Sequence, residues 1–91
     1  MLKRTRMRNG KIRITFSLPT DQPAGAVSVV GDFNDWQPGR HQLARRGNGT
    51  RSVTAELPSG CHRFRYLATG DLWFDDPAAD RIDESGSVIE V

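Results

Sequence analysis

The side chains of this chain that could support catalysis or metal binding are few, and their spacing does not suit either task. Cys61 and His62 are adjacent, and adjacent residues on a strand point to opposite faces, so they cannot act as a nucleophile and its base. Asp75 and Asp76 diverge for the same reason, which does not suit paired acid–base catalysis. Two histidines and one cysteine without regular spacing predict no metal site, and no glycine-rich phosphate loop occurs. We therefore expect a protein that is not an enzyme and needs no cofactor or metal.

The two tryptophans are the residues whose chemistry stands out. Trp36 follows a polar, turn-forming segment, where a core tryptophan would be oddly placed. Trp73 stands between Leu72 and Phe74, and if those two face the core, strand alternation turns Trp73 outward. An indole ring can stack on the apolar C–H face of a sugar, whose hydroxyls then need hydrogen-bond donors, and Arg65 is a candidate donor. Taken alone, the pattern fits ordinary packing of the tryptophans equally well.

Strands are the elements that must position these residues. Apolar and polar residues alternate, or short β-branched runs occur, in segments separated by turn signals every 8 to 12 residues or so. This pattern predicts one all-β domain, residues 1–91, folded as an immunoglobulin-like β-sandwich of about six to seven short antiparallel strands. The expected strands cover residues 12–18, 26–31, 51–57, 62–68, 72–75 and 87–91.

Charge is unevenly distributed, although the formal net charge is only +2. Six cations and no acid lie in residues 3–13, whereas residues 71–90 hold seven acids and one base. We expect the two ends to lie close together and neutralise each other, as the first and last strands of a small sandwich often do. The alternatives are a flexible basic arm at residues 1–10 and contact with nucleic acid or an anionic membrane surface. The cations are not interleaved with aromatic residues, so we do not expect nucleic-acid binding.

Cysteine usage and hydropathy bear on location. Cys61 is the only cysteine, which excludes an internal disulfide and fits a reducing cytoplasm. No apolar stretch follows the charges at residues 3–4, and no run of about 18 apolar residues occurs. We therefore expect a cytoplasmic location, with no signal peptide and no membrane span.

Three ordered motifs give the chain a resemblance to a known family. Residues 27–36 (VSVVGDFNDW), 57–66 (LPSGCHRFRY) and 70–77 (GDLWFDDP) resemble signature segments of the isoamylase N-terminal, or glycogen-binding, domains, which form carbohydrate-binding module family 48. The likeness covers nearly the whole chain, from about residue 12 to residue 91. It implies an early-set immunoglobulin-like domain that binds an α-1,4-glucan such as glycogen, starch or a maltooligosaccharide and is not itself catalytic.

The resemblance also assigns roles to single residues. Trp36 and Trp73 fall where the family stacks glucan on tryptophan, and Arg65 falls where a lysine contacts sugar hydroxyls. Asn34, in the first motif, is taken as a fourth sugar-binding residue. The family often has an asparagine just before the last strand, and residues 84–88 contain none. The alternative is therefore a protein-interaction or regulatory sandwich module that has lost sugar binding. The expected partners are an α-glucan and an enzyme of glycogen metabolism.

Overall fold

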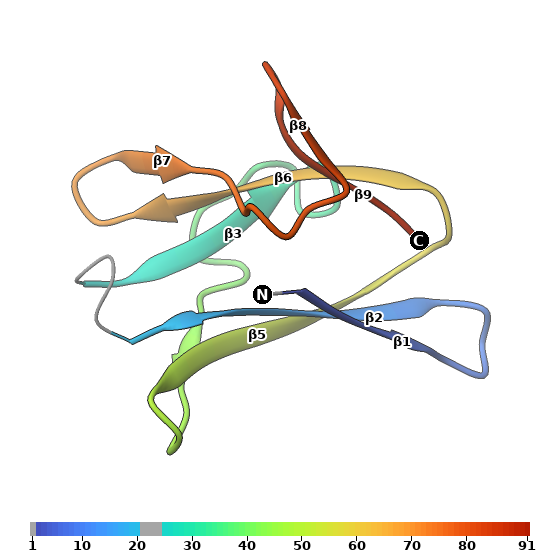
Figure 1. The fold of residues 1–91 in the computed structure, drawn as a ribbon, viewed down its shortest axis with the longest axis horizontal. Coiled ribbons are helices and arrows are strands. Elements are labelled where there is room, and N and C mark those ends of the chain that lie inside the picture. Colours follow the sequence, from blue (N-terminus) through green and yellow to red (C-terminus); the bar gives the residue numbers. More distant parts are fainter. Residues whose placement is uncertain (1, 21–24) are drawn as a thin grey trace.

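The computed structural model describes residues 2–20 and 25–91, which form strands and no helix. Two antiparallel sheets pack face to face, which confirms the predicted β-sandwich (Figure 1). The β2 sheet has the order β1-β2-β5-β4, and the β6 sheet has the order β3-β6-β9-β8 with β7 also paired to β6. Nothing in the described part of the chain is a helix long and apolar enough to cross a membrane. The strands are β1 Leu2–Arg6, β2 Ile12–Pro19, β3 Val27–Gly31, β4 Ala44–Arg45, β5 Thr50–Leu57, β6 Cys61–Ala68, β7 Leu72–Phe74, β8 Arg81–Asp83 and β9 Gly86–Glu90.

The core lies between the sheets and follows the predicted alternation along the strands. Phe16 of β2 meets Phe64 of β6 edge-to-face, with ring centroids 5.0 Å apart, and meets Tyr66 at 6.5 Å. The residues between these inward positions on β6 face the outside of the β6 sheet, because strand side chains alternate. That outer face is the one on which the predicted sugar-binding residues of β6 and β7 should lie. The fully buried core side chains include Ile14, Phe16, Val27, Val29, Leu57, Phe64, Tyr66 and Ile89.

Three strands were not predicted, namely β1, β4 and β8, and all three lie at sheet edges. Their residues are mostly exposed, so their sequences carry no alternation of apolar and polar residues. Strand β1 pairs with β2 along its whole length, from Leu2 opposite Phe16 to Arg6 opposite Ile12. Within the basic segment, residues 2–6 are therefore not a flexible arm, because backbone pairing holds them to the β2 sheet.

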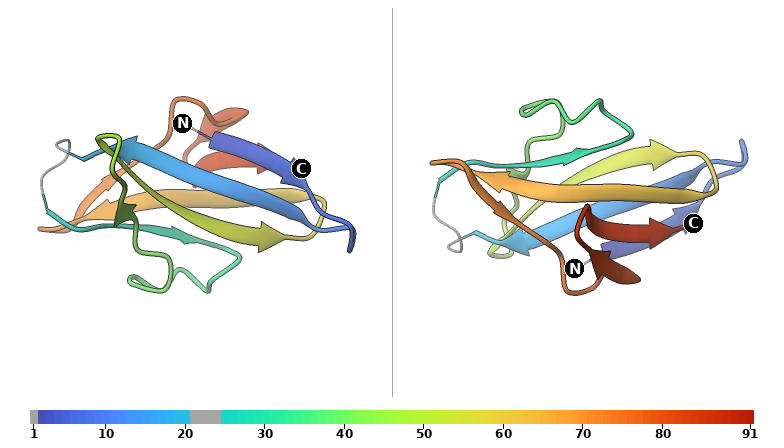
Figure 2. Two further views of the ribbon diagram at one scale, coloured as in Figure 1. Left: turned by 90° about the horizontal axis from the view of Figure 1, so that it is seen from below. Right: turned by 90° about the horizontal axis from the view of Figure 1, so that it is seen from above.

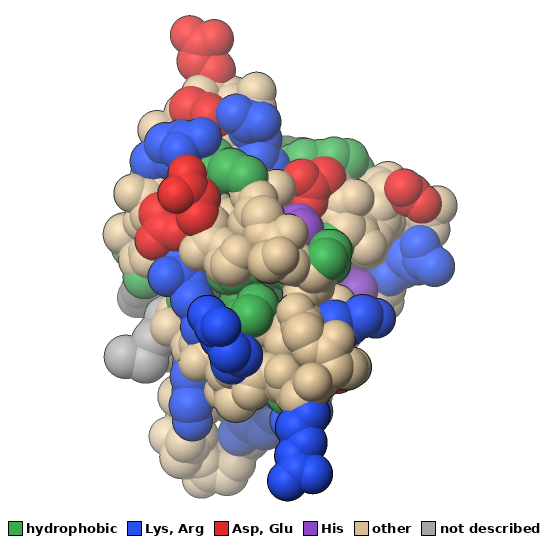
Figure 3. Space-filling model, turned by 90° about the vertical axis from the view of Figure 1, so that its right-hand side faces the viewer, with side chains coloured by type: hydrophobic (Ala, Val, Ile, Leu, Met, Phe, Trp, Pro, Cys, Tyr) green, Lys and Arg blue, Asp and Glu red, His purple; other side chains and the backbone are tan. Residues whose placement is uncertain are grey.

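The basic and acidic ends of the chain lie side by side, as the charge distribution predicted (Figure 2). Arg4 of β1 donates to the Asp80 carboxylate at 2.9 Å. The backbone N–H of Glu90 and then the Arg4 guanidinium hold the pKa of Asp80 below its usual value. Figure 3 shows acidic side chains mixed with basic ones on the upper half of one face, and basic side chains over the lower half.

The segment after β3 covers the outer edge of the β6 sheet. Val29 N donates to His41 O and Leu43 N donates to Val27 O, each at 2.9 Å, so residues 41–43 run along the free edge of β3. The chain then crosses to the β2 sheet as β4. Residues 32–40 are thereby held as a loop beside the β6 sheet (Figure 2).

Candidate functional site

Trp36 lies in a tight turn at the end of β3. The backbone N–H groups of Asn34 and Trp36 both donate to Gly31 O, at 3.1 and 2.9 Å. Asp35 and Trp36 each have φ of 56°, a left-handed conformation that non-glycine residues adopt rarely. The Trp36 side chain is not used to fill the core, because the residue is 39% exposed. The turn thus holds a strained backbone and presents a large ring to solvent, so other contacts must stabilise it.

Asn34 supplies those contacts from the interior. It is only 3% exposed, and its Oδ1 accepts from Gly31 N at 2.9 Å. Its Nδ2 donates to Val29 O at 3.0 Å and lies 2.9 Å from His41 Nδ1. The sequence-based expectation that Asn34 contacts sugar is therefore wrong, because the side chain is buried and its polar atoms bind the turn.

His41 completes this arrangement, a role that no pattern in the sequence predicted. The Asn34 amide must donate to Val29 O, so the same NH2 group faces His41 Nδ1, which must accept. The ring also contacts Phe33, with centroids 5.5 Å apart. Burial, and then the neighbouring Arg40 charge, lower the pKa of His41. The neutral form of His41 is thus the one that fits the Trp36 turn.

Trp73 lies on the outer face of the β6 sheet, as predicted. On β7, Phe74 pairs with Tyr66 and packs on it with ring centroids 5.1 Å apart, while Trp73 pairs with the outward-facing Leu67. Trp73 is 46% exposed. The expectation that Leu72 also faces the core is wrong, since it is 50% exposed. Strand β7 has three residues and Leu72 begins it next to a turn, where the sheet no longer covers the side chain.

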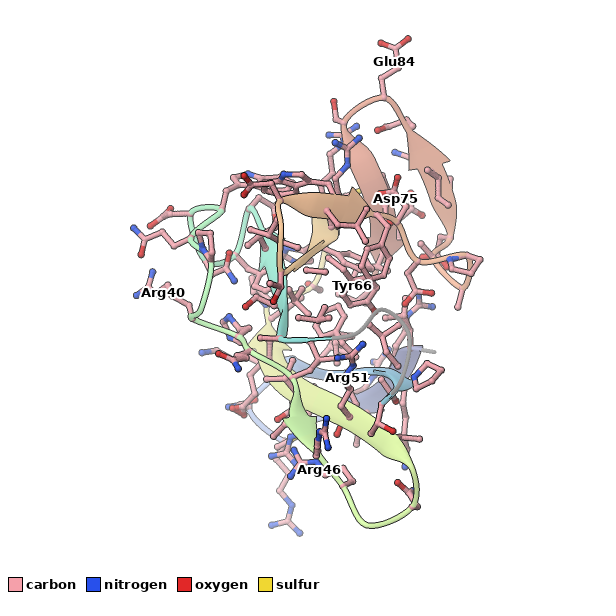
Figure 4. The ribbon with its side chains drawn as sticks, turned by 90° about the vertical axis from the view of Figure 1, so that its left-hand side faces the viewer. Arg40, Arg46, Arg51, Tyr66, Asp75 and Glu84 are labelled. Carbon is pink, nitrogen blue, oxygen red and sulfur yellow. The ribbon has the colours of Figure 1, made fainter. Side chains whose placement is uncertain are left out.

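Arg65 shares that outer face and is already engaged by the protein. Its Nη2 donates to Glu84 O at 2.9 Å, and its Nε lies 3.5 Å from Asp75 Oδ1. A Cβ at Gly86 would lie 3.1 Å from Arg65 Cγ and 3.2 Å from Nε, so the side chain extends across the glycine. Arg65 therefore ties β6 to the β8–β9 hairpin, whose tip Glu84 stands clear of the sandwich (Figure 4).

A buried network below Arg65 fixes the end of β7. Tyr66 OH donates to Asp76 Oδ2 at 2.6 Å, and Asp76 N donates to Ser87 Oγ at 3.0 Å. Ser87 Oγ in turn donates to Asp75 Oδ1 at 2.9 Å. Burial, and then the hydrogen bond to Asp76, raise the pKa of Tyr66 far above its usual value. The two aspartates diverge as predicted, but Asp76 is 1% exposed and holds the strand end in place, a role that the sequence analysis missed.

The structure therefore brings three of the four predicted residues to the β6 sheet surface and its edge. Trp36 bonds to Gly31, which pairs with Phe64, and Trp73 pairs with Leu67. Strand geometry puts Gly31, where the Trp36 turn begins, and Trp73 about 10 Å apart along the strands and about 10 Å apart across them. Two exposed indoles, with the Arg65 guanidinium on the intervening strand β6, can stack on sugar rings and bond to hydroxyls. The described residues hold no group of three His, Cys, Asp or Glu side chains that could bind a metal.

Comparison with known proteins agrees with this chemistry. A family described as the glycogen recognition site of AMP-activated protein kinase matches residues 9–91. The chain is 69% identical over 47 residues to the 1,4-alpha-glucan branching enzyme GlgB of Rhodopseudomonas palustris, covering 52% of the chain and 7% of the enzyme. It is 39% identical over 64 residues to the enzyme of the same name from Salinibacter ruber, covering 66% of the chain and 10% of the enzyme.

The match to these enzymes is confined to a small part of them. The corresponding enzyme of Thermosynechococcus vestitus is 48% identical over 40 residues, which is 44% of the chain and 5% of the enzyme. The chain thus spans a tenth or less of the length of these relatives. The family match, in contrast, covers nearly the whole chain. The chain therefore belongs to the family of the glycogen recognition site of AMP-activated protein kinase, a glycogen-binding carbohydrate-binding module of the family 48 type that is non-catalytic by itself.

Proposed function

We propose that this chain binds α-1,4-glucan, as glycogen, starch or maltooligosaccharide, by stacking glucose units on Trp36 and Trp73. The observation that carries the proposal is the exposure of both indole rings, 39% and 46%, in a chain whose other aromatic side chains are buried or half-buried. Tryptophan rings left in water cost apolar hydration free energy, which a stacked sugar would recover at roughly 25 cal/mol for each Å² covered. Glucose presents apolar C–H faces of about the size of an indole.

The polar part of the site supports the same proposal. Arg65 bears five N–H groups, of which one is bonded to Glu84 O, so donors remain for sugar hydroxyls. Its contact with Asp75 and its position across Gly86 fix the guanidinium on the outer face. A fixed donor loses less conformational entropy when a ligand binds than a free arginine would. Arginine in place of the lysine that the family resemblance implies is thus a pre-organised donor.

We also propose that the module serves an enzyme of glycogen metabolism. Support comes from the relatives, which are named 1,4-alpha-glucan branching enzymes and of which the chain matches only a small part. The exposed thiol of Cys61 is compatible with the reducing cytoplasm, where we propose that the module acts. Co-sedimentation of such an enzyme with glycogen should increase when the module is present, and an unchanged sedimented fraction would count against this role.

Titration calorimetry with maltoheptaose and cellohexaose tests the main proposal. We expect heat of binding with the α-linked sugar only, and loss of that heat in Trp73→Ala and in Trp36→Ala. Leu72→Ala is the matched control, because Leu72 is a large exposed apolar residue next to Trp73 on the same strand but faces the other way. Equal binding of both sugars, no binding of either, or an equal loss in Leu72→Ala would overturn the proposal.

A further inference from the structure

Asp75 lies beside the proposed stacking ring and opposite Arg65. The pairs Leu67–Trp73 and Tyr66–Phe74 define the register of β6 and β7, and one step further this register puts Arg65 opposite Asp75. The 3.5 Å contact between Arg65 Nε and Asp75 Oδ1 agrees with that placement. Residues two apart on an extended chain point to the same side and lie about 7 Å apart. Asp75 and Trp73 thus share the outer face of the β6 sheet.

One oxygen of the Asp75 carboxylate is held and the other is available. Oδ1 accepts from Ser87 Oγ at 2.9 Å and faces Arg65 Nε. Oδ2 accepts no hydrogen bond from any residue in the described ranges 2–20 and 25–91, and 26% of the side chain is exposed. An ionised carboxylate has about four acceptor positions. The carboxylate is therefore fixed in orientation by one oxygen while the other can bind an external donor.

This arrangement matches the hydroxyl groups of a sugar. Neighbouring hydroxyls on a glucose ring each donate one hydrogen bond and accept others, so a donor side chain next to an acceptor side chain can bind both at once. Arg65 has donors only, and Asp75 has acceptors only. A hydrogen bond to a charged acceptor is stronger than one between neutral groups. The cross-strand pair thus offers both halves of this pattern within reach of a ring stacked on Trp73.

We propose that Asp75 is a sugar-binding residue whose Oδ2 accepts a hydrogen bond from a hydroxyl of the glucose unit stacked on Trp73, next to the donor Arg65. This assignment rests on the proposed glucan binding and adds an acceptor that neither the motifs nor the family comparison assigned. Figure 4 shows Asp75 at the base of the raised hairpin, above Tyr66. The hairpin and the end of β7 then form one side of the site.

Calorimetry with maltoheptaose on Asp75→Ala and Asp75→Asn tests the assignment. We expect Asp75→Ala to raise the Kd roughly tenfold or more. Asp75→Asn should raise the Kd less, because the amide oxygen still accepts a hydrogen bond, although without the charge. Asp71→Asn is the matched control: it makes the same charge change two residues before Trp73, at a residue with φ of 58° where asparagine is well tolerated. Wild-type affinity in Asp75→Ala, or an equal loss in Asp71→Asn, would overturn the assignment. If the wild type binds and Trp73→Ala does not, such a result leaves the proposed function standing.

A second measurement separates sugar contact from a role limited to positioning Arg65, and it needs no variant. The carboxyl carbon-13 resonance of Asp75 in the wild-type protein should shift on addition of maltoheptaose with the same Kd as the heat of binding. The resonance of Asp83, whose carboxylate is paired with Arg63 at 2.9 Å, should not move. A stationary Asp75 resonance at saturating sugar would show that Asp75 only positions its neighbour.

Discussion

Replacement of Asn34 by alanine should loosen the turn that carries Trp36. The variant removes three side-chain contacts, to Gly31 N, Val29 O and His41 Nδ1, at 2.9, 3.0 and 2.9 Å. Each is worth about 1 kcal/mol net, and more where the remaining partner stays buried without a replacement. We therefore expect the free energy of unfolding to fall by about 3 kcal/mol. A domain of this length has a total stability of roughly 5 to 14 kcal/mol, so the folded state should persist.

Urea denaturation followed by circular dichroism measures this loss, and calorimetry with maltoheptaose on the folded variant measures its effect on binding. We expect weaker sugar binding as well, because the left-handed backbone at Asp35 and Trp36 is no longer held in place. Asp35→Asn is the control: it changes the same turn at an exposed position whose conformation asparagine tolerates. A loss of less than about 1 kcal/mol in Asn34→Ala would refute the role given to the buried amide.

Three further predictions concern the groups that support the site. The folded state lowers the pKa of His41 below 6.5. The contribution of neutral His41 to stability should therefore be complete above pH 6.5 and decline as pH falls through the folded-state pKa. In a pH series of melting temperatures, His41→Asn should lack this dependence. Tyr66→Phe should cost about 2 kcal/mol in urea denaturation, since it leaves the buried Asp76 carboxylate without its phenol donor, and unchanged stability would contradict the network. Gly86→Ala should lower the melting temperature more than Gly39→Ala. A methyl group at residue 86 would meet a backbone oxygen at 3.0 Å, whereas one at residue 39 would meet open space. Equal melting temperatures of the two variants would refute the prediction.

The sandwich and its core could be predicted because burial and strand alternation act on each strand locally. The inward residues of β2 and β6 showed their period of two directly in the sequence. The edge strands β1 and β8 gave no such signal. Backbone hydrogen bonds to a neighbour define them, and those bonds do not depend on apolar side chains.

The exposed rings of the site were also predictable, whereas its supports were not. Trp36 and Trp73 stood out by type and place, and β7 pairing explains why Trp73 points outward. Asn34 was assigned to the sugar because it is polar and close to Trp36 in sequence. Only the path of residues 41–43 along β3 shows that its amide is enclosed by backbone and His41. The buried role of Asp76 likewise depends on a partner ten residues earlier in the chain.

The two indole N–H resonances of the wild-type protein test the central claim most directly. The chain has two tryptophans, so its nitrogen-15 correlation spectrum should contain two such signals, one from Trp36 and one from Trp73. We predict that both signals shift during titration with maltoheptaose and follow one saturation curve, since one glucan chain would cover both rings. Two signals that stay in place at saturating sugar, or that titrate with unrelated affinities, would contradict a shared tryptophan platform.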